Sequence, residues 1–179
     1  MSLETATFGA GCFWCLEAAM NQLQGVETAI SGYMGGHTQN PNYQQICTGQ
    51  TGHAEVVQIR FDPDVIRFQQ LCQIFFCLHD PTQLNRQGND VGTQYRSVIF
   101  FHSDEQQRQA SQLLAEMNQQ QVFAAPIVTE LSPASTFYPA ESYHQGYFMQ
   151  NPQQGYCQFI VAPKMAKFRA EFAALLKKH

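Results

Sequence analysis

The apolar residues near the start of the chain follow first a strand spacing and then a helix spacing. Residues 4–10 look like a short strand that runs into Gly9-Ala10-Gly11, where glycine permits a sharp turn from strand to helix. A helix is predicted to open at Cys12 and to stop at Gly25. Its apolar positions recur at helical spacing: Leu16, Ala19, Met20 and Leu23.

Alternation returns after this helix. Residues 26–34 are predicted to be a strand, and residues 35–52, rich in Gly, Asn and Thr, a long loop of the kind that tends to be functional. Residues 53–61 alternate well enough to form another strand. Its apolar face carries Val57, Ile59 and Phe61. Glu55 shares the parity of that face, which predicts a partly buried carboxyl group.

Helices and strands alternate irregularly further along the chain. A helix with an apolar stripe precedes a polar loop at residues 80–93 and a strand at residues 95–101. Ser103 and Gln106 have the spacing of a capping box for a third helix. Residues 127–131 are predicted to be one more strand.

The last third of the chain has aromatic clusters, a predicted loop at residues 151–157 and a predicted amphipathic helix at residues 165–176. The lysines of that helix are interpreted as a solvated face. The pattern as a whole predicts an α+β fold. We expect a two-layer sandwich with a mixed central sheet, Cys12 at the N-terminus of the first helix and a loop-rich C-terminal tail.

Composition narrows the class of protein. A chain of 179 residues suits one domain, predicted to span residues 1–179, and can bury a core without disulfides or metals. Apolar residues make up 44% and charged residues 13%, which is typical of a globular protein. No apolar run is long enough to span a bilayer. The net charge of −4, with no basic stripe, disfavours nucleic acid as a partner.

Six cysteines raise the question of compartment. Residues 1–7 lack the basic start and apolar stretch of a secretory signal, so we expect a reducing compartment, the cytoplasm. In such a compartment cysteines indicate redox chemistry, metal binding or plain burial.

Cys12 is the most informative of these cysteines. A thiol attacks as its thiolate, and an ordinary cysteine is only slightly ionised at neutral pH. The free N–H groups and dipole of a helix start favour negative charge, so Cys12 is placed for activation. A structural thiol that caps the helix is the alternative.

Cys12 and Cys15 also form a C-x-x-C pair, which suits half of a zinc site or a thioredoxin-like redox pair. The zinc reading lacks a second ligand pair, and the thioredoxin-like reading lacks a clear β-α-β order. A cysteine hydrolase is a third alternative, because Cys12, His144 and Asn151 occur in the order of papain-like enzymes. Phe13 stands where those enzymes have tryptophan.

Several longer motifs are similar to one family, the type A peptide methionine sulfoxide reductases. The matching segments are Gly11-Cys12-Phe13-Trp14, Asn40-Pro41-Asn42-Tyr43, Gly52-His53-Ala54-Glu55-Val56-Val57, His79-Asp80-Pro81-Thr82, Gly88-Asn89-Asp90-Val91-Gly92-Thr93-Gln94-Tyr95-Arg96-Ser97, Tyr143-His144-Gln145 and Gly155-Tyr156-Cys157. The resemblance extends from about residue 5 to about residue 165. It implies an α+β sandwich and reduction of methionine (S)-sulfoxide, free or in proteins.

The resemblance implies roles for the site residues. A sulfoxide oxygen leaves poorly, so attack by Cys12 on the sulfur needs a proton, which Glu55 can give if burial raises its pKa. Tyr43 and Tyr95 match tyrosines that bind the oxygen, and Asp90 matches an aspartate that organises the site. Two further matches, Phe13 and Trp14, correspond to the aromatic wall that receives the S-methyl group. His144 is left outside the catalytic set.

Turnover needs a second thiol, because attack leaves Cys12 as a sulfenic acid that condenses with a thiol. Cys157 matches the resolving cysteine of the family, and Cys15 is the alternative. The remaining cysteines are expected to be passive: Cys47, Cys72 and Cys77. The resemblance implies thioredoxin as the reductant. No metal, flavin or nucleotide is expected as a cofactor, and neither nucleic acid nor a membrane as a partner.

Overall fold

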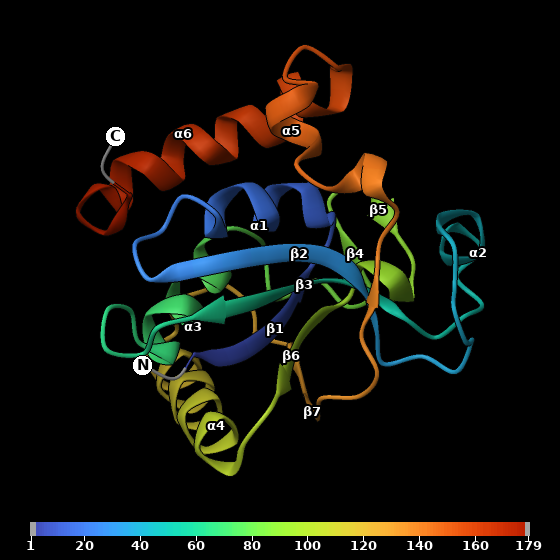
Figure 1. Cartoon of the computed structure of the whole chain (residues 1–179). Helices are drawn as coiled ribbons and strands as arrows, with labels where there is room; N and C mark the ends of the chain where they lie inside the picture. Colours follow the sequence, from blue (N-terminus) through green and yellow to red (C-terminus); the bar gives the residue numbers. More distant parts are fainter. Residues whose placement is uncertain (1–2, 178–179) are drawn as a thin grey trace.

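The computed structural model describes residues 3–177, which form a mixed sheet with helices packed against it (Figure 1). The strand order of this six-stranded sheet is β7-β6-β1-β3-β2-β8. Neighbouring strands are antiparallel except for β6 and β7, which are parallel. The strands are β1 (Glu4–Ala10), β2 (Val26–Met34), β3 (Ala54–Phe61), β6 (Ser97–Phe101), β7 (Glu130–Pro133) and β8 (Tyr138–Pro139), with β4 (Arg86–Gln87) and β5 (Asp90–Val91) in a separate short hairpin.

Most helices connect these strands, and α5 and α6 follow the last strand at the C-terminal end of the chain. They are α1 (Phe13–Met20), α2 (Tyr43–Cys47), α3 (Phe68–Cys77), α4 (Asp104–Gln119), α5 (Tyr147–Gln150) and α6 (Ala162–Glu171). The 3₁₀ turns are η1 (Thr93–Tyr95), η2 (Ser142–His144) and η4 (Ala173–Leu175), and η3 (Cys157–Val161) is π-helical. Since α1 joins β1 to β2 and α3 joins β3 to β6, the order β6-β1-β3-β2 is that of a split β-α-β fold.

The two faces of the sheet bury different clusters. The larger cluster joins the sheet to α1 and α3, where Phe8 stacks on Phe68 and Phe75 with ring centroids 5.9 and 5.1 Å apart. It also contains Val57, Ile59 and Phe61, so the predicted apolar face of β3 points to the helices. A smaller cluster on the other face is covered by residues of the segment 134–137. This arrangement is the predicted two-layer α+β sandwich with a mixed sheet.

Local predictions hold in most of the sheet and fail in the loops. The first strand matches its predicted bounds, and the N-cap Ser103 accepts the Gln106 N–H at 3.2 Å. The Gln106 side chain departs from a full capping box, because its oxygen accepts from the N–H of His102 instead. The predicted strand at 127–131 lies later, at Glu130–Pro133, because it pairs with β6 in that register. The predicted loop 35–52 contains α2, which Asn42 caps.

The C-terminal tail contains one clear correction. Residues 151–154 lack regular structure, but Cys157 begins η3 and does not lie in the predicted loop. This segment leads directly into α6, which packs along α1 (Figure 1). No helix within residues 3–177 combines the length and the apolar character needed to cross a membrane. The ends of the predicted domain, residues 1–2 and 178–179, lie outside the described residues.

Candidate active site

Cys12 stands at the turn from β1 into α1. It is the N-cap residue, with extended backbone angles, so its side chain lies at the end of the helix where the first N–H groups have no partner within the helix. Gly11 makes the turn at φ +87°, where a Cβ would come within 2.8 Å of the Gln87 Cβ. Both the positive φ and the close contact require glycine before the cysteine.

Glu55 reaches the same point from β3. Its carboxyl oxygen Oε1 accepts the Phe13 N–H at 3.4 Å, and the side chain is 2% exposed. The pKa of Glu55 is raised to about 8, chiefly by burial; the hydrogen bond from the Phe13 N–H opposes the shift, and the charge of Asp90 adds to it. The carboxyl group is therefore largely protonated at neutral pH and can donate a proton.

Every residue predicted for catalysis or substrate binding lines one cavity of about 170 Å³. Its lining consists of Cys12, Phe13, Trp14, Tyr43, Glu55, Asp90, Tyr95, Gln154 and Tyr156. The structure thus brings together residues from α1, α2, β3, the β4–β5 hairpin and the tail. It adds Gln154 and Tyr156, which sequence reasoning did not assign to the site.

Two phenol groups face the acid. Tyr43 begins α2, where its backbone N–H donates to Glu141 Oε2 at 2.9 Å, and Tyr95 ends η1. Burial and then the charge of Glu55 raise the pKa of each phenol well above its ordinary range. Both hydroxyls therefore remain protonated and can donate hydrogen bonds into the cavity.

The aromatic side of the cavity is built on Trp14. Its indole stacks on Tyr147 with centroids 4.0 Å apart and meets Tyr156 edge to face at 5.7 Å. Phe13 packs on Tyr33 behind it. These contacts hold a rigid apolar wall beside the thiol, which suits a methyl group or a thioether.

Asp90 and Tyr156 link the hairpin to the tail. The Tyr156 hydroxyl donates to Asp90 Oδ2 at 2.8 Å. The hydrogen bond holds the residue before Cys157 at the rim of the cavity. Tyr156 could have been found from its place in the Gly155-Tyr156-Cys157 motif, whereas Gln154 carries no such signal.

His144 lies behind the aromatic wall and has a structural partner. Its Nδ1 accepts the Trp14 Nε1–H at 3.3 Å, and burial lowers its pKa while Glu141 opposes the shift. The hydrogen bonds of residues 3–177 include none between Cys12 and His144, so the pairing that a papain-like hydrolase needs is not formed. The described cysteines are free, and no metal-binding group of His, Cys, Asp or Glu occurs among these residues.

The ionisation of Cys12 differs from the prediction. Burial raises the pKa of this thiol well above its ordinary value, the charge of Glu55 adds to the effect, and the Trp14 N–H only partly offsets it. Loss of hydration thus outweighs the helix start. Cys12 rests as a thiol, and its activation has to accompany the reaction.

The two candidate resolving cysteines occupy different places. Cys15 is one turn along α1 from Cys12 and is 5% exposed. Cys157 is fully buried in the main cluster and does not line the cavity.

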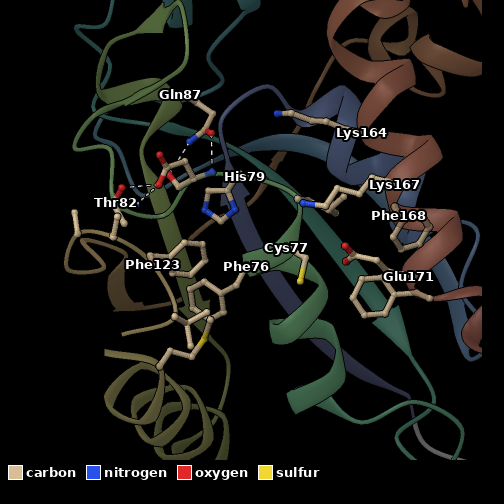
Figure 2. A pocket seen from close by; sticks show the side chains of 17 residues that line it. Phe76, Cys77, His79, Thr82, Gln87, Phe123, Lys164, Lys167, Phe168 and Glu171 are labelled. Carbon is tan, nitrogen blue, oxygen red and sulfur yellow. Dashed lines mark hydrogen bonds between the residues drawn. The ribbon is translucent and has the colours of Figure 1, made fainter. Parts of the chain in front are cut away.

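A second, larger cavity lies between α3, residues 122–125 and α6 (Figure 2). It encloses about 570 Å³ and shares no lining residue with the Cys12 cavity. Both ring nitrogens of its His79 are engaged, with Phe75 O at 2.6 Å and Ser97 Oγ at 2.8 Å. Burial lowers the pKa of His79 to about 4, so this ring is neutral and offers no free base.

A cysteine at a helix start, a protonated carboxyl group and phenol donors on one cavity form the site of a thiol-dependent oxidoreductase. A family model described as peptide methionine sulfoxide reductase matches residues 4–176. The chain therefore belongs to the peptide methionine sulfoxide reductase family, and it is an enzyme of that kind.

Individual relatives agree with this assignment. The peptide methionine sulfoxide reductase MsrA of Polynucleobacter asymbioticus is 57% identical over 175 residues, covering 98% of this chain and 92% of the relative. The reduced form of Mxr1 from Saccharomyces cerevisiae has a TM-score of 0.79 at 34% identity, covering 87% of this chain and 89% of that one. Mxr1 in complex with Trx2 has a TM-score of 0.55 at 25% identity, covering 81% and 84%.

Proposed function

We propose that the protein reduces methionine (S)-sulfoxide, free or in proteins, to methionine through a sulfenic acid on Cys12. One observation carries the proposal: Cys12 and a protonated Glu55 line the same cavity. The (S) preference follows from the family resemblance. The natural substrates are then oxidised proteins and the free amino acid.

The cavity suits a single oxidised methionine side chain. At about 170 Å³ it is smaller than the clefts of roughly 300–1,000 Å³ that hold drug-sized ligands. Phe13 and Trp14 would receive the S-methyl group. Tyr43 and Tyr95 would donate hydrogen bonds to the sulfoxide oxygen, and Glu55 would protonate it.

Proton transfer from Glu55 solves the problem of the un-ionised thiol. Once Glu55 has given its proton to the oxygen, its carboxylate can accept the thiol proton of Cys12, whose sulfur attacks the sulfoxide sulfur. The oxygen passes to Cys12 with one proton, and the other proton stays on Glu55. Cys12 is oxidised by two electrons to the sulfenic acid, and the substrate is reduced to the thioether.

Recycling requires a disulfide and an external reductant. We propose that Cys157 forms the disulfide that the external reductant reduces, because Cys157 directly follows Tyr156, which lines the cavity. Thioredoxin is the proposed reductant, since the similar protein Mxr1 has been crystallised with Trx2. A single domain in a reducing cytoplasm accords with free cysteines and a thioredoxin partner.

An assay on the separated epimers of methionine sulfoxide tests the proposal. With dithiothreitol as reductant, the purified protein should convert the S epimer to methionine and leave the R epimer. Cys12→Ser should abolish the reaction, and Glu55→Gln should slow it by about 10²–10⁴-fold, the usual contribution of a general acid. Activity in Cys12→Ser, or equal turnover of both epimers, would contradict it.

A further inference from the structure

The second cavity has an aromatic interior that is built by three separate segments (Figure 2). α3 contributes Phe76, residues 122–125 contribute Phe123, and α6 contributes Phe168. Figure 2 shows Phe76 and Phe123 across the cavity from Phe168. The volume of about 570 Å³ falls within the roughly 300–1,000 Å³ that is usual for small-molecule sites. A flat apolar group can therefore lie between aromatic side chains.

Two lysines of α6 give the same cavity a positive side. Figure 2 shows the side chains of Lys164 and Lys167 directed from α6 into the cavity. Lys164 is half-buried and Lys167 is exposed. Within residues 3–177 the ion pairs include neither lysine. Both ammonium groups are therefore available to an anion.

The charge of Lys164 reaches the interior of the cavity. Burial lowers the pKa of His79, the hydrogen bond to Phe75 opposes the shift, and the charge of Lys164 adds to it. His79 is neutral and both of its ring nitrogens are engaged, so it does not compete with Lys164 for an anion. Lys164 is therefore the main positive group that a bound anion would meet.

The two acidic groups of the lining are placed differently from each other. Asp80 Oδ1 accepts the backbone N–H of Thr82 at 3.0 Å and its hydroxyl at 2.5 Å. Glu171 has no such partner among the described residues and is exposed. Its charge opposes that of Lys167, since Glu171 raises and Lys167 lowers the pKa of Cys77, whose main shift is upward from burial. Glu171 would therefore repel an incoming anion.

We propose that the second cavity is a ligand site and that it takes an aromatic monocarboxylate. The aromatic ring would lie among Phe76, Phe123 and Phe168, because aromatic rings pack well in offset or edge-to-face arrangements. The carboxylate would meet the ammonium groups of Lys164 and Lys167. This site is additional to the proposed reductase function and does not depend on it.

The lining also explains why the ligand carries one negative charge and is bound without being converted. Two lysines face two carboxylates, so a doubly charged phosphate would meet more repulsion from Asp80 and Glu171 than a single carboxylate would. Neutral His79 and the protonated Cys77 thiol offer neither a base nor a nucleophile. Since the Cys12 cavity shares no lining residue with this site, the ligand should not compete with methionine sulfoxide.

Isothermal titration calorimetry with 2-naphthoate tests the site, and 2-naphthamide is the matched ligand of the same shape without the charge. The wild type should bind one equivalent of 2-naphthoate and should bind 2-naphthamide at least about tenfold more weakly, the usual difference for a hydrogen bond to a charged group. An excess of methionine should not displace 2-naphthoate. Thermal unfolding is measured in parallel, because a ligand that binds only the folded chain raises the unfolding temperature.

Variants of opposite charge locate the ligand. Lys164→Met should weaken 2-naphthoate about tenfold and leave the binding of 2-naphthamide unchanged. Glu171→Gln should instead tighten 2-naphthoate about two- to fivefold, because a repelling charge at an exposed position is removed. Arg60→Met removes a positive charge from an exposed position of β3 outside the cavity and should bind both ligands as the wild type does.

Four results would overturn the assignment. They are equal affinity of the wild type for the two ligands, unchanged 2-naphthoate binding in Lys164→Met, displacement of 2-naphthoate by methionine, and neither heat nor a shift in unfolding temperature at millimolar 2-naphthoate. If Lys164→Met does not fold, the wild-type comparison of the two ligands still decides. Failure of the proposed reductase function would appear only in the epimer assay, which contains no naphthoate.

Discussion

At the scale of single residues, the chemistry of the site depends on how far burial raises the pKa values of Glu55 and Cys12. Glu55 and Cys12 both lose hydration, and both pKa values rise. Because its pKa is raised, the Glu55 carboxyl group is still protonated at neutral pH and can act as an acid. For the same reason, the Cys12 thiol stays protonated and is not present as the thiolate. The two groups can still act together, because Glu55, after it has given its proton to the sulfoxide oxygen, can accept the thiol proton of Cys12.

The raised pKa of Glu55 makes stability depend on pH. The folded protein holds this proton up to about pH 8, while the unfolded chain loses it near 4.5, so folding binds a proton between these values. The wild type should therefore lose this contribution to stability as pH rises from 5 to 8, and Glu55→Gln should lose less stability over the same range. The difference should grow by about 1.4 kcal/mol per pH unit at most, and by about 2–4 kcal/mol in all.

Unfolding in urea at several pH values between 5 and 8 measures this difference. Glu116→Gln, on the exposed side of α4, is the control and should follow the wild type. If the curves of Glu55→Gln and wild type run parallel, the carboxyl group is already ionised at neutral pH and is not the proposed acid.

At the scale of elements, the turn between β1 and α1 positions the nucleophile. Gly11 occupies a left-handed conformation against Gln87, and the Gln87 side chain is held by Asp80 through its N–H at 2.8 Å and its carbonyl at 2.9 Å. The turn therefore rests on a fixed neighbour. A side chain at residue 11 would push Cys12 away from the cavity.

Gly11→Ala should destabilise the protein by about 1–3 kcal/mol, from the positive φ and the contact with Gln87. It should also lower kcat, because the Cys12 sulfur shifts from its place beside Glu55. Thermal unfolding and the epimer assay measure the two effects. Gly155→Ala is the matched control for stability, since its Cβ would meet no atom within 4 Å; equal behaviour of both variants would contradict the argument.

At the scale of the whole molecule, the cavity exists because distant segments converge on it. Glu141 shows how they are tied together. It accepts from the Tyr33 hydroxyl of β2 at 3.0 Å, from the Tyr43 N–H of α2 at 2.9 Å and from the Tyr143 hydroxyl of η2 at 3.1 Å. One carboxyl group therefore holds α2, and with it a donor of the cavity, against the sheet.

Glu141→Ala should loosen α2 and leave the buried Tyr33 hydroxyl without its partner. We expect a loss of about 1–3 kcal/mol in stability and a KM for methionine sulfoxide raised about three- to tenfold. kcat should change less, since Glu141 is not part of the cavity lining. Steady-state kinetics separates the two constants, and an unchanged KM would show that α2 is held by other contacts.

The sequence by itself determined the local features, because periodicity and turn chemistry act over a few residues. Spacing placed β1, the start of α1 at Cys12 and the face of β3 that carries Glu55. Motif resemblance named seven of the nine residues that line the cavity, including Tyr43 and Tyr95, which are far apart in the chain. α2 and η3 escaped prediction, because short or irregular helices have little periodicity of their own.

Only the tertiary structure decided those properties of a residue that depend on the groups packed around it. The raised pKa of Cys12 results from burial and from Glu55, a residue on another strand, and it reverses what the helix start alone suggests. The burial of Cys157 in the main hydrophobic cluster results from the packing of the C-terminal segment on the rest of the fold. Desolvation and contact between distant segments are properties of the folded chain, so no local pattern in the sequence encodes them.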